Sequence, residues 1–466
     1  MNYRLIILTL SLLLLVGCER PSPTAQIVVV NPPAIIEADA TAPPTPSPQS
    51  QNSVAPTQTA VPPTPTPTTS PTPFYTGERS AACGQILPIL PVNNTPTTTS
   101  LSPNAEALNA LKAIMPDITR PALDRILQAP ETVGLAAYRI GDEANGVYLN
   151  ADMQMPLASV VKVITLVAYA EAVADGQLDP TAIVTLDTLD QFYLPNTDLG
   201  AHPRAIRELD ENENLLTNPD AVLMDKVPWM IVRHSSNAAA DYLHLLLGQT
   251  RIEETAVSLN LTSQTAPCTF LGQFLAMGNH TRSASQNLAA INAYLADPTA
   301  YGSEAALLAD AYSSDPNFRE DEQNARSGRR GTPANIQRIF SHALNAYGSP
   351  TDYANLMARI AQNGLSSSES SFIARRYLEW PMQFPANQAL FSNIGYKNGS
   401  LPGILTTVYY AYPLGETTPI VIALFYRDLP NNTYRQWRAS LPHDEFARWI
   451  LANPAAIPAL KAVINP

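Results

Sequence analysis

The spacing of apolar residues becomes that of a folded domain from about Asn104 onward. Residues 104–115 carry apolar side chains at helical spacing. Residues 131–153 contain two apolar runs typical of strands, joined by a turn between Gly141 and Gly146. Near the end of the chain, residues 405–413 and 419–428 are again apolar runs rich in β-forming side chains. The pattern therefore predicts strands at both ends of the domain.

Helical patterns fill the region between these strands. Residues 156–167 form an almost wholly apolar stretch, and residues 227–248 contain two helical runs separated by a polar turn. A further helix is expected from Thr332-Pro333, and residues 444–454 close the chain as a helix. We therefore expect an α+β fold in which one sheet is formed from both ends of the domain, with a helical region in the middle.

The N-terminus has the features of an export signal. Arg4 precedes an apolar run from Leu5 to Val16, which is shorter than the roughly 20 residues of a membrane-spanning helix. The run ends in Leu-Val-Gly directly before Cys18, which resembles the lipobox of bacterial lipoproteins. That resemblance implies a signal peptide over residues 1–17 and a lipid on Cys18, hence an exported, membrane-anchored lipoprotein facing the extracytoplasmic space. An ordinary signal peptide with an incidental cysteine is the alternative.

The composition of residues 18–80 predicts an extended tether. Fifteen of the 43 prolines lie between Pro21 and Pro73, among many Thr and Ser residues and few charges, so the stretch cannot bury a core. In polyproline geometry it would reach roughly 150 Å at most. Residues 81–103 form a transition, and residues 104–466 the folded domain.

The composition of the chain makes some classes of binding partner improbable. The 466 residues carry a formal net charge of -12, with a pI of about 5.0, which disfavours nucleic acid binding and a basic membrane patch. We expect a monomer whose membrane contact is the lipid alone. With Cys18 lipidated, an exported setting permits a disulfide between Cys83 and Cys268, and two free buried thiols remain the alternative.

The apolar stretch "PLASVVKVITLV" contains the first candidate chemistry. Ser159 and Lys162 lie one helical turn apart, so their side chains share a face. Burial of an ammonium group lowers its pKa, and a lysine with a lowered pKa can take the proton of a neighbouring serine. A surface lysine is the alternative. However, lysines are only five of the 28 basic residues, and this is the only Ser-x-x-Lys in the chain.

Two further motifs follow downstream. Ser235-Ser236-Asn237 occupies the polar turn between two helical runs, where a helix N-cap is the alternative reading. Residues 397–400 read Lys-Asn-Gly-Ser, where Gly399 leaves room for something to approach a strand. A hairpin turn at Asn-Gly is the alternative there.

In this order the three motifs resemble those of the penicillin-recognising serine hydrolases, and of class A β-lactamases most closely. The resemblance runs from about Asn104 to the C-terminus. It implies the β-lactamase/transpeptidase-like fold, an antiparallel sheet flanked by helices with a helical subdomain. It also implies that Ser159 is the acylated nucleophile and Lys162 its base. The other implied roles are proton transfer by Ser235, substrate-amide binding by Asn237, carboxylate binding by Lys397, and an oxyanion hole from the backbone N–H groups of Ser159 and Ser400.

The chain departs from the family motifs in two places. Ser236 replaces an aspartate that usually stiffens the loop, and Asn398 replaces a hydroxyl residue, for which Ser400 is a candidate substitute. Class A enzymes also need a deacylating glutamate on a loop before a Thr-Pro helix start, with an asparagine four residues later. Glu320 and Asn324 have that spacing, and a solvated loop with chance residues is the alternative.

The expected function is therefore hydrolysis of β-lactam amides through a Ser159 acyl-enzyme. A D-alanyl-D-alanine peptidase or esterase using the same serine is the first alternative, and a cell-wall peptide-binding domain without turnover is the second. The six histidines form no His-Glu-x-x-His motif, and the chain has no Cys-x-x-Cys and no Gly-rich phosphate loop. We expect neither a metal nor an organic cofactor.

Overall fold

The computed structural model describes residues 83–89, 93–327 and 332–464. The predicted signal peptide, Cys18 and the proline-rich tether over residues 18–80 lie outside the described residues. Among the helices that the structure describes, none combines the length and the apolar character needed to span a bilayer.

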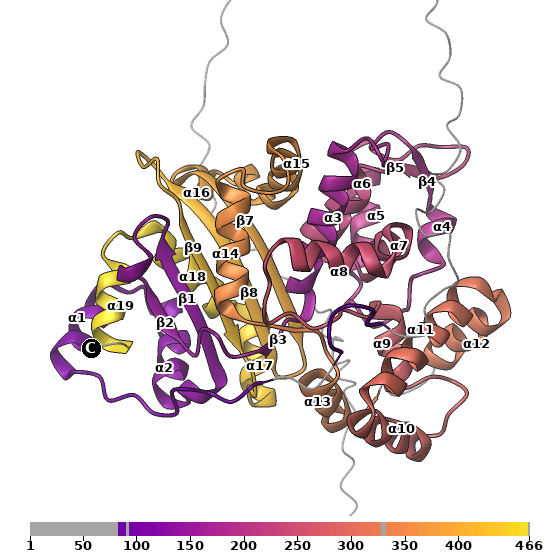
Figure 1. Cartoon of the computed structure of the whole chain (residues 1–466), viewed down its shortest axis with the longest axis horizontal. Helices are drawn as coiled ribbons and strands as arrows, with labels where there is room; N and C mark the ends of the chain where they lie inside the picture. Colours follow the sequence, from indigo (N-terminus) through magenta and orange to yellow (C-terminus); the bar gives the residue numbers. More distant parts are fainter. Residues whose placement is uncertain (1–82, 90–92, 328–331, 465–466) are drawn as a thin grey trace, which may run out of the picture. The chain divides into compact units, whose positions relative to one another are not determined.

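A five-stranded antiparallel sheet organises the domain (Figure 1). Its order is β2-β1-β9-β8-β7, so strands from the two ends of the domain are neighbours, as the sequence predicts. Every residue of β9 is buried, because β9 lies in the middle of the sheet and helices cover both faces. The strands are β1 (Val133–Arg139), β2 (Val147–Leu149), β7 (Phe391–Leu401), β8 (Ile404–Pro413) and β9 (Ile420–Tyr426).

Helices pack on both faces of the sheet through their apolar sides and form two separate cores. One core lies against α14 and α15 and includes α3 of the helical region, and the other lies against α1, α2, α17, α18 and α19. The expected helices over residues 104–115 and 444–454 both belong to the second core. These sheet helices are α1 (Ala105–Ile114), α2 (Arg120–Gln128), α14 (Pro350–Ala361), α15 (Ser368–Leu378), α16 (Pro385–Gln388), α17 (Asn431–Ser440), α18 (Pro442–Ala452) and α19 (Ala456–Ile464).

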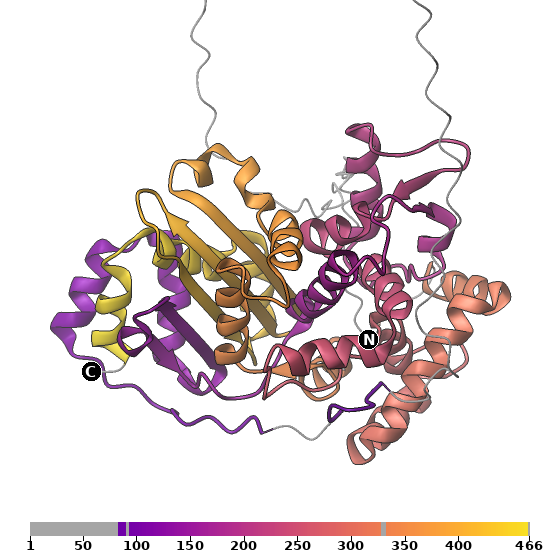
Figure 2. The ribbon, with the colours of Figure 1, turned by 45° about the horizontal axis from the view of Figure 1, so that its top comes forward.

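The middle of the chain forms the predicted helical region, which lies beside the β7 side of the sheet in both ribbon views (Figures 1 and 2). Two short strand pairs belong to it or join it to the sheet: β4 (Ile183–Thr185) with β5 (Ala221–Leu223), and β3 (Met155–Pro156) with β6 (Tyr347–Gly348). Its helices are α3 (Lys162–Ala174), α4 (Leu186–Asp190), α5 (Ala201–Glu211), α6 (Lys226–Trp229), α7 (Asn237–Leu247), α8 (Gln249–Ser258), α9 (Phe270–Met277), α10 (Ala284–Ala296), α11 (Pro298–Ser314), α12 (Pro316–Ser327) and α13 (Ala334–Ala343).

The segment 83–89 is fastened to the helical region at two points. Cys83 forms a disulfide with Cys268, which stands just before α9, so the sequence alternative of two free thiols is excluded. The buried carboxylate of Glu253 on α8 accepts hydrogen bonds from the backbone N–H groups of Gln85, Ile86 and Leu87. The start of the described chain is therefore held against α8 and α9.

We expect the disulfide to contribute about 2–4 kcal/mol to the free energy of unfolding, because it closes a loop across 185 residues of sequence separation. Urea unfolding with and without reductant measures this difference. The double variant Cys83→Ser/Cys268→Ser should already have the lower midpoint, and reductant should not lower it further. An unchanged midpoint in the double variant would contradict the expectation.

Candidate active site

Ser159 lies on a single 3₁₀ turn, η4 (Ala158–Val161), directly before α3. The expected helix over residues 156–167 thus begins as a tighter turn, and Ser159 is the one half-buried residue within an otherwise buried stretch. Ala158 has a φ of 48°, a left-handed conformation that costs energy for a residue with a Cβ. The turn is held from the sheet by Thr406 Oγ1, which donates to the Leu157 carbonyl at 2.8 Å. Strained and externally fixed backbone at this position is typical of a catalytic nucleophile.

Lys162 is buried, as the sequence predicts, and its ammonium group has specific partners. Its backbone N–H donates to the Ser159 carbonyl, which keeps the two residues on one turn. Its Nζ donates to Ser235 O at 2.7 Å and to Asn237 Oδ1 at 2.7 Å, and lies 3.4 Å from Ser235 Oγ. The ring of Phe270 lies 4.3 Å from the same nitrogen. Burial lowers the pKa of Lys162 to about 7, so the amine can be neutral near neutral pH.

Two carboxylates limit how far that pKa falls. Asp198 and Asp241 both stabilise the charged form of Lys162 and so act against its burial. Asp241 lies one turn after Asn237 on α7, where its oxygens accept the backbone N–H groups of Phe270 and Leu271 at 2.8 and 2.7 Å. Burial also raises the pKa of Asp241 to about 7. Lys162 therefore lies near two carboxylates, one on α7 and one in the loop before α5.

Ser235 and Asn237 reach Lys162 because the preceding helix ends abruptly. Residues Met230–His234 form a single π turn, η5, and Ser235 then adopts a left-handed φ of 65°. Ser236 starts α7 as its N-cap, with its Oγ accepting the Ala239 N–H at 3.1 Å. The N-cap alternative is thus true of Ser236, while Ser235 and Asn237 on either side point to the lysine.

The third motif lies inside strand β7, and the alternative of a hairpin turn at Asn-Gly is wrong. The turn between β7 and β8 falls at Pro402-Gly403 instead, where Gly403 has a φ of 84°. Lys397 is buried and its Nζ donates to Ser235 Oγ at 3.1 Å and to Asn398 O at 2.7 Å. Burial and the nearby charge of Lys162 lower the pKa of Lys397 well below its usual value. One hydroxyl, that of Ser235, therefore lies between two lysine amines.

Gly399 brings β7 against the turn that holds Ser159. A Cβ at this position would lie 2.7 Å from Ser159 N and 2.7 Å from Leu157 O, so only glycine permits the contact. Ser400 follows on the strand, and its Oγ is 3.1 Å from Tyr434 OH, which lies on α17. The backbone of β7 thus runs directly beside the Ser159 N–H. This close approach is the arrangement that an oxyanion hole needs.

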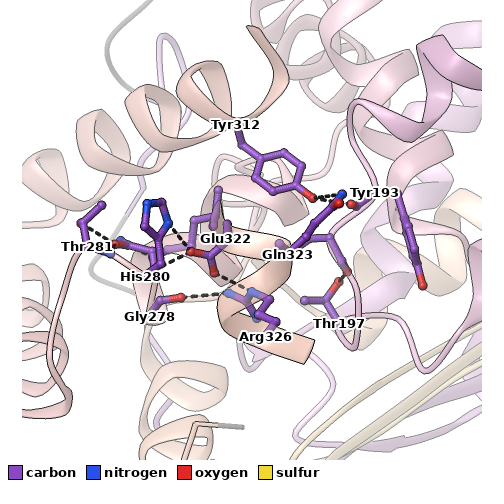
Figure 3. Close-up of polar contacts among 12 residues, drawn as sticks. Tyr193, Thr197, Gly278, His280, Thr281, Tyr312, Glu322, Gln323 and Arg326 are labelled. Carbon is purple, nitrogen blue, oxygen red and sulfur yellow. Dashed lines mark hydrogen bonds and ion pairs between the residues drawn. The ribbon is translucent and has the colours of Figure 1, made fainter. Parts of the chain in front are cut away.

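The structure does not bring Glu320 and Asn324 to this group. Residues 316–327 form helix α12 rather than the expected loop, and both side chains are exposed on it. The acidic residue that turns inward is Glu322, which accepts from the His280 N–H and pairs with Arg326 (Figure 3). Helical spacing explains this choice, because residues two apart on a helix point in different directions. In the described part of the chain, neither Glu320 nor Asn324 bonds to Ser159, Lys162 or Ser235.

Some site residues could not be found from the motifs. Asp241 and Phe270 act on Lys162, and His202 bonds to Ser236, yet none belongs to a recognisable local pattern. The one available signal was the position of Asp241, four residues after Asn237 on an apolar helix. Within the described ranges no group of His, Cys, Asp or Glu side chains could hold a metal ion.

The antiparallel sheet, the helical region and the clustered Ser159, Lys162, Ser235 and Lys397 fit the β-lactamase/transpeptidase-like superfamily. The profile of the family described as Beta-lactamase enzyme family matches residues 119–442, well over half of the chain. The chain therefore belongs to the β-lactamase enzyme family.

Solved structures similar to this chain include three of the same superfamily at low identity. A β-lactamase from Sphaerobacter thermophilus is 16% identical with a TM-score of 0.44, covering 74% of this chain and 95% of its own. A β-lactamase from Chitinophaga pinensis is 17% identical with a TM-score of 0.42, covering 72% and 99%. The protein PBP-A is 13% identical with a TM-score of 0.39, covering 74% and 98%. No curated protein matches the chain.

Proposed function

We propose that this chain is a serine hydrolase that opens β-lactam amides by forming an acyl-enzyme on Ser159. The observation that carries the proposal is Lys162. It is buried on the same turn as Ser159, hydrogen-bonded to Ser235 and Asn237, and its pKa is lowered to about 7. A lysine in this state can take the serine proton at physiological pH, which an ordinary lysine cannot.

The proposed acylation uses the contacts in sequence. Ser159 Oγ attacks the lactam carbonyl carbon while neutral Lys162 takes its proton. Negative charge develops on the carbonyl oxygen, beside the backbone N–H groups of Ser159 and Ser400. The carbon–nitrogen bond then breaks, and the nitrogen takes a proton from Ser235 Oγ. That hydroxyl lies 3.4 Å from Lys162 Nζ and 3.1 Å from Lys397 Nζ, so a lysine can restore its proton.

Lys397 is proposed to bind the carboxylate that β-lactams carry. Without substrate its pKa is lowered by burial and by Lys162. A carboxylate beside Lys397 favours the charged ammonium and raises that pKa again. Asn237 holds Lys162 through its Oδ1, and its amide nitrogen is the group proposed to bind the acyl side-chain amide of the substrate.

Covalent labelling tests the proposal. The protein is incubated with a fluorescent penicillin, denatured and digested, and the labelled peptide is identified by mass spectrometry. We expect one adduct, on Ser159. A failure to form any adduct, or an adduct confined to another residue, would overturn the proposal and favour a binding domain without turnover.

Release of the acyl group is expected to be independent of Glu320. Because Glu320 is exposed on α12, Glu320→Gln should leave the deacylation rate unchanged within about twofold, as for most surface substitutions. The rate is measured by chasing the label with unlabelled penicillin. Asp321→Asn, on the same exposed stretch of α12, is the matched control. A drop of about 100-fold or more in Glu320→Gln alone would assign it the role of deacylating residue.

A D-alanyl-D-alanine peptidase is the second candidate function. The position of Glu320 favours it, since an acyl-enzyme without a dedicated deacylating carboxylate is released slowly. Release of D-alanine from an acyl-D-alanyl-D-alanine peptide, compared with release of hydrolysed penicillin, separates the two candidates.

We further propose that the protein is exported, anchored by a lipid on Cys18, and monomeric. The sequence pattern around Cys18 supports the anchor. Incorporation of a labelled fatty acid that is lost in Cys18→Ala tests the anchor, and light scattering of the detergent-solubilised protein tests the monomer.

A further inference from the structure

A chain of hydrogen bonds, buried at Ser236 and His202 and exposed at Asp190, leads away from Ser236 into a segment outside the three motifs. Ser236 Oγ is 2.9 Å from His202 Nδ1, and His202 Nε2 is 3.1 Å from Asp190 Oδ1. Ser236 is fully buried and His202 is 1% exposed. Asp190 ends α4 and His202 stands at the start of α5, so the long segment between the nucleophile helix and the second motif supplies both partners.

These are the residue types of a Ser-His-Asp hydrolase triad, but Ser236 is not placed to act as a nucleophile. Its hydroxyl has no access to solvent, and its Oγ already accepts the Ala239 N–H as the cap of α7. A substrate carbonyl carbon cannot reach an atom enclosed in this way. The group must therefore act through the atoms that it fixes.

The tautomer with its proton on Nε2 satisfies every contact in the group: Ser236 Oγ accepts from the Ala239 N–H and donates to His202 Nδ1, and Nε2–H donates to the Asp190 carboxylate. The orientation of the ring is further fixed by Tyr193, whose ring centroid lies 5.1 Å from that of His202. The His202 ring thus holds Ser236 in one orientation.

Ser236 is flanked by the two residues that hold the proposed base. Ser235 and Asn237 each accept a 2.7 Å hydrogen bond from Lys162 Nζ. Ser235 has a left-handed backbone conformation. Other conformations of the loop would relieve this backbone strain. An anchor on the central residue of this loop therefore determines where both acceptors lie.

We propose that His202 is a positioning residue for the second motif: its bond to Ser236 keeps Ser235 and Asn237 on Lys162. The inference rests on the proposed function, because its effect is read through acylation of Ser159. The segment 186–211 then contributes to the site. It rigidifies the loop Ser235-Ser236-Asn237 from outside, as an acidic side chain within that loop could do from inside.

The test compares variants of His202 by the rate of penicillin labelling per folded molecule. His202→Ala removes both hydrogen bonds, and we expect labelling to slow by about 10- to 100-fold, the cost of misplacing groups around a reacting atom. In His202→Asn the side-chain amide can still reach Ser236 but not Asp190. We expect it to recover the rate to within about threefold of the unaltered protein, because the position of the loop is restored.

His244→Ala is the matched control, because His244 is a similarly buried histidine on α7 that bonds to Gln249 rather than to the motif. It should lose stability while its folded fraction labels at the unaltered rate. If His202→Ala labels as fast as His244→Ala per folded molecule, or if His202→Asn gives no recovery, the positioning role is refuted. If the unaltered protein itself does not label, the proposed function fails first. An adduct on Ser236 would overturn the inference by making that serine the nucleophile.

Discussion

Lys162→Met is expected to slow acylation of Ser159 by about 10²- to 10⁴-fold, the usual contribution of a positioned general base. Methionine fills a similar volume in the buried site but has no lone pair that can take the serine proton. It also leaves Ser235 O and Asn237 Oδ1 without their 2.7 Å donor. The rate is measured by stopped-flow or timed labelling with a fluorescent penicillin.

The same residue sets a pH dependence in the unaltered protein. Since the pKa of Lys162 is about 7, roughly one tenth of the amine is neutral at pH 6 and roughly nine tenths at pH 8. The acylation rate should therefore rise about tenfold from pH 6 to pH 8, because the neutral form is the active base. An unshifted lysine would instead give a rate that keeps rising tenfold per pH unit across this range.

Two control variants accompany the Lys162→Met measurement. The Ser159→Ala protein lacks the proposed nucleophile and therefore gives the background rate of labelling. Lys226→Met changes a partly exposed lysine that pairs with Asp225, and should label at the unaltered rate. A Lys162→Met protein that labels as fast as Lys226→Met would refute the assignment of the base, as would a flat profile between pH 6 and pH 8.

The sequence predicted the part of the site that local patterns describe. Strand runs at both ends predicted the main sheet, and the three motifs indicated Ser159, Lys162, Ser235, Asn237 and Lys397, which the fold brings together. These residues could be found because each lies on or beside a short element with its own pattern. An apolar helix with one lysine is an unusual stretch, and it stands out without knowledge of its neighbours.

The supporting residues could not be predicted, because their role depends on contacts between distant segments. His202 is 34 residues from Ser236 in the sequence, and Phe270, which contacts Lys162 and donates its backbone N–H to Asp241, lies on the separate helix α9. Glu320 illustrates the reverse case. Its spacing from Asn324 fits a loop motif, but the same residues form a helix with Glu322 on the inner face, and the motif then points outward.

Gly399→Ala is expected to abolish most acylation by the folded protein, with a loss of about 100-fold or more for a displacement near 1 Å at the reacting group. The added Cβ would lie 2.5 Å from Thr406 Oγ1 and 2.7 Å from both Leu157 O and Ser159 N. The last two are backbone atoms of the nucleophile turn, and Thr406 Oγ1 donates to Leu157 O, so no flexible side chain can move aside. Either η4 or β7 must shift.

Gly395→Ala provides the comparison that separates a damaged site from a weakened fold. Gly395 lies on the same strand, four residues before Gly399, and a Cβ there would meet the ring of Tyr410. Both variants should be less stable by about 1–3 kcal/mol, since both overpack the domain. Only Gly399→Ala should lose labelling per folded molecule, because only its Cβ contacts the backbone of Ser159. Equal labelling by the two variants, measured where circular dichroism shows both folded, would mean that the nucleophile turn tolerates displacement, and that its contact with β7 is not part of the oxyanion site.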